Sequence, residues 1–209
     1  MKKAKIILRT ILLTTISIML ILFGLYIWLN HRIDNVIDKE TYNNLVEAIK
    51  ASEDLPDRFY EIYGQVTKFD EKSTTNKYLS NELLNMQNYH MKNSCPCFDI
   101  SSEFAFNATI DYRMFGINKI TIGLTLDKDV SPKKCLDFYL SKFDFLYSII
   151  GIKNASQFYY QKDLEQLSDD EMFELSVMTL NPAFYNKIRK SENLKKKMEE
   201  LKTNQPINK

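Results

Sequence analysis

Few residues of this 209-residue chain have types and spacings that suit chemistry. Among its three cysteines, Cys135 can form a disulfide with Cys95 or with Cys97, or the thiols can stay free or partly paired. A structural zinc site needs four ligands, and with only His31 and His90 in the chain no fourth ligand stands out. The sequence contains no glycine-rich phosphate loop, no HExxH and no CxxC motif.

The acidic pair Glu53–Asp54 is the remaining candidate. A carboxylate can act as a general base when it lies within hydrogen-bond reach of the proton that it removes. The negative charge of Asp54 would then tune the basicity of Glu53. The pair also directly precedes Leu55-Pro56, and the residues alone favour an ordinary solvated acidic pair at a turn. Both interpretations stay open at the level of the residues.

The charge of the chain is unevenly distributed along the sequence. The 28 Lys and Arg residues nearly balance the 27 Asp and Glu residues, which argues against a basic nucleic-acid binder. Four of the cations, Lys2, Lys3, Lys5 and Arg9, are the only charges in the first 30 residues. The remainder of the chain therefore carries a net charge of about −3.

An apolar segment, residues 11–29, lies near the N-terminus, and any functional site is expected in the residues that follow it. At about 1.5 Å per residue, a helix of this length crosses a hydrocarbon core of roughly 30 Å. The preceding cations predict a cytoplasmic end at 1–9, a transmembrane helix at 10–30 and one extracytoplasmic domain at 31–209. A cleaved signal peptide is the alternative, but no small-residue cleavage site follows the segment.

Helical signals dominate the rest of the chain and predict a mainly α domain behind a short stalk at 31–40. The predicted helices are 39–51, 57–66, 78–91, one that begins at Pro132 after the N-cap Ser131, one that follows the capping box Ser168–Glu171 and ends at Asn181-Pro182, and 191–202. Residues 67–77 are polar, and this composition predicts turns in that segment.

Residues 103–126 show a different pattern. Apolar residues alternate with other residues twice, and the two runs are separated by turn-like residues 115–118. The alternating residues are Phe104, Phe106, Ala108, Ile110 and Tyr112, then Ile120, Ile122, Leu124 and Leu126. A period of two predicts a short β-hairpin within 103–126.

Four ordered stretches in the second half carry a further pattern. They are Leu126-Asp127 with Ser131 and 135–141, then Phe145 with 151–162, then 167–171, then 181–186. These stretches resemble the motifs LE…SK..ILE.YLN, F…G…YGI..AA..YFGK, LT..E and NP..YNP of the peptidoglycan glycosyltransferase (transglycosylase) domain, glycosyltransferase family 51. The resemblance is divergent, is strongest over about 118–200 and implies a helical, lysozyme-like fold. It would make 120–127 helical, against the predicted hairpin.

The same resemblance implies site residues in the first half. In the family, a glutamate in an ED..F..H.G motif is the base that acts on the acceptor hydroxyl, and Glu53 and Asp54 resemble that motif with two extra residues inserted. A second alignment, through Leu-Pro, puts Thr67 at the glutamate position. The second family glutamate falls on Lys119, and the motif G.STITQQ has only a faint counterpart at 107–110. The residues themselves imply no cofactor, while the resemblance implies a divalent cation.

The implied function is a membrane-anchored protein that polymerises a lipid-linked disaccharide precursor into glycan strands. It would be a single-pass protein of the bacterial cell (inner) membrane, with a cytoplasmic N-terminus. One alternative is a catalytically silent relative that binds precursor, glycan strand or another cell-wall synthesis protein, and another is an unrelated membrane-tethered interaction module. Tyr147 and 158–160 are candidates for sugar stacking or for the core. The basic tail around 187–202 is a candidate contact for membrane lipid or a solvated face.

Overall fold

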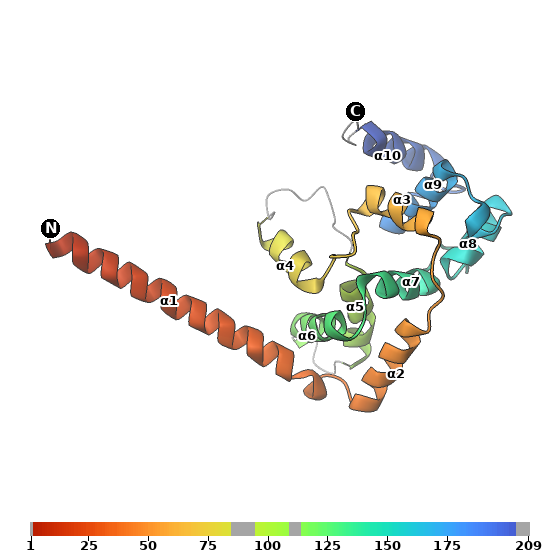
Figure 1. Cartoon of the computed structure of the whole chain (residues 1–209). Helices are drawn as coiled ribbons and strands as arrows, with labels where there is room; N and C mark the ends of the chain where they lie inside the picture. The colour runs from red at the N-terminus through yellow and green to blue at the C-terminus, as the bar shows by residue number, and fades with distance from the viewer. Residues whose placement is uncertain (1, 85–94, 109–113, 204–209) are drawn as a thin grey trace.

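The computed structural model describes residues 2–84, 95–108 and 114–203 as helices joined by short connections (Figure 1). The elements are α1 (Lys2–His31), η1 (Ile33–Asn35), α2 (Lys39–Lys50), α3 (Asp57–Thr67), α4 (Thr75–Leu84), α5 (Pro96–Ala108), α6 (Phe115–Asp129), α7 (Pro132–Lys142), α8 (Ile152–Tyr160), η3 (Leu164–Gln166), α9 (Asp169–Leu180) and α10 (Ser191–Thr203). This mainly α architecture confirms the predicted fold class and agrees with a lysozyme-like domain.

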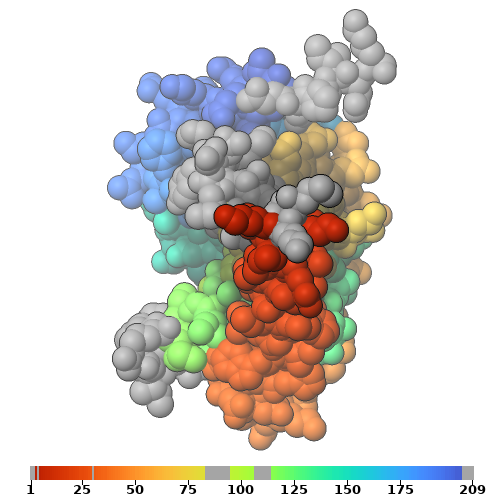
Figure 2. Space-filling view, turned by 90° about the vertical axis from the view of Figure 1, so that its left-hand side faces the viewer, coloured from red at the N-terminus to blue at the C-terminus, as the bar shows by residue number. Residues whose placement is uncertain are grey.

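Helix α1 projects from one face of the domain (Figures 1 and 2). Its segment Lys5–Leu29 has a mean hydropathy of 2.4 and none of it is buried, so the helix is long and apolar enough to cross a membrane. At its end, the guanidinium of Arg32 lies 4.7 Å from the ring centroid of Trp28 and donates to Oδ1 of Asn118 in α6 (3.1 Å). These contacts connect the apolar helix directly to the domain.

Two hydrophobic clusters share helix α7. One is built from α3, α7, α8, α9 and α10, and the other from α2, α5, α6 and α7. In α7, Leu136 and Leu140 belong to the first cluster and Cys135 to the second. Val36 and Ile37, in the segment predicted to be a stalk, are buried in the second cluster, so the domain packs up to the end of η1.

The β-hairpin predicted within 103–126 is wrong for the residues that the structure describes there. Residues 103–108 belong to α5 and 115–126 belong to α6, while 109–113 lie outside the described residues. Six consecutive residues of α6, 121–126, are buried. A helix that is buried on every side has no polar face, so its sequence shows no period of 3.6 and a period of two can arise by chance.

The amphipathic and capped helices form as predicted. Ser131 accepts a hydrogen bond from Lys134 N at the start of α7, and Ser168 and Glu171 form the predicted capping box of α9. Helix α4 begins at Thr75 rather than at 78, because the Asp127 carboxylate of α6 accepts a hydrogen bond from the Thr75 backbone N–H (2.7 Å). The second half of the predicted helix 78–91 lies outside the described residues.

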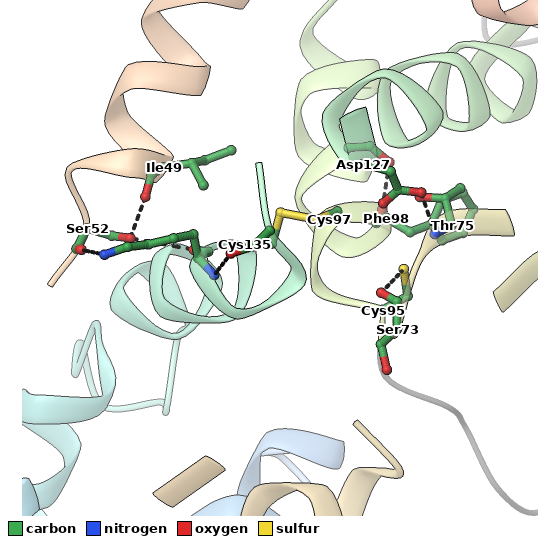
Figure 3. Close-up of a disulfide and its surroundings, with 12 residues drawn as sticks. Ile49, Ser52, Ser73, Thr75, Cys95, Cys97, Phe98, Asp127 and Cys135 are labelled. Carbon is green, nitrogen blue, oxygen red and sulfur yellow. Dashed lines mark hydrogen bonds between the residues drawn. A yellow bond between two sulfur atoms is a disulfide. The ribbon is translucent and has the colours of Figure 1, made fainter. Parts of the chain in front are cut away.

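A disulfide joins α5 to α7 through Cys97 and Cys135 (Figure 3). Cys95 is the free and buried cysteine, and its Sγ lies 3.5 Å from the Ser73 carbonyl oxygen. Of the pairings open from the sequence, the structure therefore contains the one that uses Cys97.

Candidate functional site

Glu53 and Asp54 lie on the connection between α2 and α3, where Pro56 starts the next helix. Both side chains are exposed and each forms an ion pair: Glu53 with Lys153 at the start of α8, and Asp54 with Lys134 of α7 (2.8 Å). The hydrogen bond and positive charge of Lys134 lower the pKa of Asp54. The two acids are thus held toward different helices.

A pocket of about 350 Å³ opens where this connection meets α7 and the start of α8. Glu53 lines it, as do residues from α7 and the 150–154 segment. The polar lining residues are Ser52, Glu53, Asp137, Ser141, Lys142, Lys153 and Asn154. The structure therefore places the candidate base Glu53 at the rim of a pocket whose far wall belongs to the segment resembling the transglycosylase motifs.

Asp137 is a buried acid in this wall, and in the sequence it stood out only as part of the stretch 135–141 that resembles a family motif. Its side chain is 0% exposed, and its Oδ1 accepts hydrogen bonds from the Tyr60 hydroxyl (2.5 Å) and the Leu55 backbone N–H (3.3 Å). Its Oδ2 accepts no hydrogen bond from the described residues and lies 3.9 Å from Lys134 Nζ. Burial raises the pKa of Asp137. An acid within the apolar stripe of α7 was the one sequence signal that could have indicated this position.

Gly151 shapes the pocket between α7 and α8. Its φ of +87° places it in a region that residues with a side chain rarely adopt, and a Cβ there would lie 2.7 Å from the Ser141 carbonyl oxygen. The Gly151 N–H donates to the Phe143 carbonyl oxygen (2.9 Å). Only glycine lets the chain approach α7 this closely before α8 begins.

The alternative positions for catalytic acids provide no carboxylate at this pocket. Thr67, at the end of α3, is buried, and its hydroxyl donates to the Tyr63 carbonyl oxygen (2.8 Å). The Lys119 ammonium lies 3.9 Å from the ring centroid of Phe98. Asp127 accepts the hydrogen bond from the Thr75 backbone N–H at the start of α4, and burial raises its pKa. Residues 109–110 of the faint G.STITQQ counterpart lie outside the described residues.

A divalent cation, which the family resemblance implied, has no fitting ligand set in the described part of the chain. No group of three or more His, Cys, Asp or Glu side chains there lies close enough to hold a metal ion. We therefore assign no chemical step to a metal.

The aromatic residues considered for sugar stacking divide into two groups. Tyr159 and Tyr160 are partly buried, with hydroxyls that donate to the Phe145 carbonyl oxygen (2.8 Å) and to Glu174 (2.9 Å). Tyr147 and Phe158 are 50% and 44% exposed, and their ring centroids lie 6.2 Å apart. The first two rings pack the domain, whereas the other two form an exposed pair.

The basic tail is partly neutralised within the fold. Lys187 forms an ion pair with Glu174 (3.1 Å), and Lys202 of α10 forms one with Asp170 of α9 (2.5 Å). These contacts give both cations a structural role in joining the C-terminal segment to α9. Contact of this tail with lipid stays a prediction.

Comparison with known proteins finds similarity in the second half of the chain. The family model described as "Transglycosylase" matches residues 113–205. The chain is 30% identical over 70 residues to penicillin-binding protein 1F of Bacillus subtilis (34% of this chain, 10% of that protein). It is 32% identical over 78 residues to the biosynthetic peptidoglycan transglycosylase of Pasteurella multocida (37% of this chain, 32% of that protein).

These alignments cover only part of this chain and of each relative. The chain spans between about a tenth and a third of the length of the relatives given, and the family match starts after Glu53, Asp54 and Thr67. The matched segment contains α6 to α10, including the α7 and α8 walls of the pocket. The segment 113–205 therefore matches a divergent transglycosylase domain.

Proposed function

We propose that this protein is a membrane-anchored member of the family that binds peptidoglycan glycan at the outer face of the membrane without polymerising it. The observation that carries the proposal is the state of Glu53. Its carboxylate is held by the ammonium of Lys153 rather than left free toward an acceptor hydroxyl. A general base must present a lone pair to the proton that it removes, and the contact with Lys153 engages Oε1 of the Glu53 carboxylate.

The other aligned positions support the same conclusion. In the second alignment Thr67 stands at the catalytic glutamate position, and Lys119 stands where the second family glutamate would fall; neither side chain can act as a carboxylate base. In contrast, the segments that pack the domain, from α6 to α10, still match the family model. Preserved packing together with altered catalytic positions favours a binding role.

The location of the protein is part of the proposal. The bacterial relatives, the apolar helix α1 and its N-terminal cations support a single-pass protein of the cell membrane, with 1–9 in the cytoplasm and 31–209 outside. A disulfide between Cys97 and Cys135 supports an oxidising, extracytoplasmic setting for the domain. There the glycan strand or its lipid-linked precursor would be the binding partner.

The second candidate is a working polymerase, and the pocket favours it. Glu53 lines the pocket, so an acceptor sugar hydroxyl that entered there would lie near its carboxylate. Lys153 would have to move away from Oε1 before that oxygen of Glu53 could accept the proton. This mechanism therefore requires a rearrangement that glycan binding alone does not.

Binding can be tested by sedimentation. The full chain in detergent is mixed with insoluble purified peptidoglycan and centrifuged, and we expect the protein in the pellet, from which soluble peptidoglycan fragments displace it. Cellulose serves as a matched control because it has the same glycosidic linkage without the acetamido groups. Protein that stays in the supernatant with peptidoglycan would contradict the proposal.

A further inference from the structure

The connection between α7 and α8 contains three successive residues in left-handed backbone conformation. Leu146, Tyr147 and Ser148 have φ angles of 70°, 55° and 62°. For residues with a side chain this conformation is unfavourable, because the Cβ crowds the following carbonyl oxygen, and it usually occurs as single residues. A run of three is therefore a conformation that the surrounding structure must enforce.

Hydrogen bonds on both sides hold this turn in place. The Asp144 carboxylate accepts from Leu146 N (2.7 Å), and Phe145 N donates to the Ile149 carbonyl oxygen (2.9 Å). The Phe145 ring is fully buried, and its carbonyl oxygen accepts from the Tyr159 hydroxyl (2.8 Å). The turn is anchored to the core at its base and projects its tip outward.

The result is an exposed aromatic surface. Tyr147, at the tip of the turn, lies against Phe158 of α8 with an angle of 28° between the ring planes. Phe158 in turn meets the ring of Tyr159 edge to face, with centroids 4.9 Å apart. Two rings that remain 50% and 44% exposed are thus fixed in position by a strained turn and a packed helix.

This aromatic pair is continuous with the pocket that Glu53 lines. Asn154 lies one helical turn before Phe158 on α8, and Asn154 and Ile150 both line the pocket. The Asn154 amide donates to the Ile150 carbonyl oxygen (2.7 Å). A ligand that lies on the rings therefore extends toward Asn154 and Lys153, whose polar groups can receive its hydrogen-bonding substituents.

We propose that Tyr147 and Phe158 form a stacking surface for a pyranose ring of a peptidoglycan glycan, with the adjoining sugar at the pocket. The apolar C–H face of a pyranose matches an aromatic face, while its hydroxyl and acetamido groups need polar partners of the kind that the pocket supplies. Two rings cover far less area than a stable protein–protein interface requires, which favours a saccharide over a protein partner. This inference rests on the proposed function and names its binding surface.

The test measures binding of soluble peptidoglycan tetrasaccharide to the full chain in detergent by titration calorimetry. We expect the dissociation constant to rise about five- to tenfold in Tyr147→Ala and in Phe158→Ala, since each removes one stacking ring. Tyr147→Phe keeps the ring and is expected to restore binding relative to Tyr147→Ala. Phe184→Ala removes a ring that is equally exposed, at 51%, but does not belong to the pair, and binding should stay within about twofold.

The outcomes separate this inference from the proposed function. If the wild type binds the tetrasaccharide and both alanine variants bind equally well, with unchanged thermal unfolding, the stacking surface is refuted and glycan binding stands. If the wild type binds neither tetrasaccharide nor insoluble peptidoglycan, the proposed function fails as well. Lipid-linked disaccharide in micelles serves as the second source of the same sugars. Weaker binding of both ligands by Tyr147→Ala supports the stacking surface, whereas unchanged binding of both refutes it.

Discussion

Opening the Cys97–Cys135 disulfide is expected to lower the free energy of unfolding of the domain by about 4 kcal/mol. The bond joins residues 38 positions apart, and closing a loop of that size removes roughly 13 cal/mol/K of entropy from the unfolded chain, which is about 4 kcal/mol at 25 °C. Both cysteines are fully buried in the second hydrophobic cluster, so the bond ties α5 to α7 where they pack. A loss of this size is a large fraction of the stability of an ordinary domain.

The assay is urea unfolding of the full chain in detergent, followed by circular dichroism, for wild type and for Cys97→Ala/Cys135→Ala. Cys95→Ala is the matched control, because it removes a buried thiol without opening the bond, and it should cost about 1 kcal/mol. A double variant that loses no more than this control would refute the reasoning.

Alkylation separates the two pairings that the sequence allows. In the native protein Cys95 should not react, because burial raises the pKa of its thiol to about 12. In denaturant without reductant, Cys95 should be the cysteine that becomes modified. Modification of Cys97 instead would show that Cys95 pairs with Cys135.

Four further substitutions test the local structure by thermal unfolding. Gly151→Ala should destabilise by about 2 kcal/mol, because the new Cβ meets backbone at a positive φ, whereas Gly116→Ala in the open part of α6 should stabilise by about 0.5 kcal/mol; equal effects would contradict this. Ser148→Gly should stabilise by about 1 kcal/mol by relieving a left-handed residue, and a loss of stability would show that the turn is not strained. The hydrogen bond from Lys162 and the cap of α9 lower the pKa of Glu171 from 4.5 to about 2. The stability that Glu171 contributes is therefore present above pH 4.5 and lost as the pH falls through about 2. A Glu171→Gln variant should be less stable by about 0.5 kcal/mol at pH 7, and this difference should disappear below pH 2.

The elements that could be predicted from the sequence are those whose signals are local. Ser131-Pro132 and the Ser168–Glu171 box lie next to the helices that they start, and α2 and α3 each bury one face, so their apolar residues recur at helical spacing. Helix α6 shows the limit of this reasoning. Because α6 is surrounded by α1, α4, α5 and η1, the periodicity of its sequence does not distinguish its core positions from its surface positions.

The candidate site could be predicted only in part, because its residues contact others that lie far away in the sequence. The acidic pair at 53–54 could be found from the sequence, but Lys153, which forms the ion pair with Glu53, lies 100 positions later. Asp137 is hydrogen-bonded by Tyr60 and Leu55, about 80 positions earlier, so its place in the apolar stripe of α7 marks an unusual acid but does not indicate a pocket wall. Contacts of this kind depend on the packing of whole helices, which residue types and spacing do not determine.

The central claim, a transglycosylase domain that binds glycan without polymerising it, is tested most directly by a polymerisation assay. The purified full chain is incubated with lipid-linked disaccharide-pentapeptide and a divalent cation, alongside Glu53→Gln and an active transglycosylase as the positive control. We expect no polymer from the wild-type chain under conditions in which it co-sediments with peptidoglycan. Polymer that the wild type forms and Glu53→Gln does not would contradict the claim and make Glu53 the catalytic base.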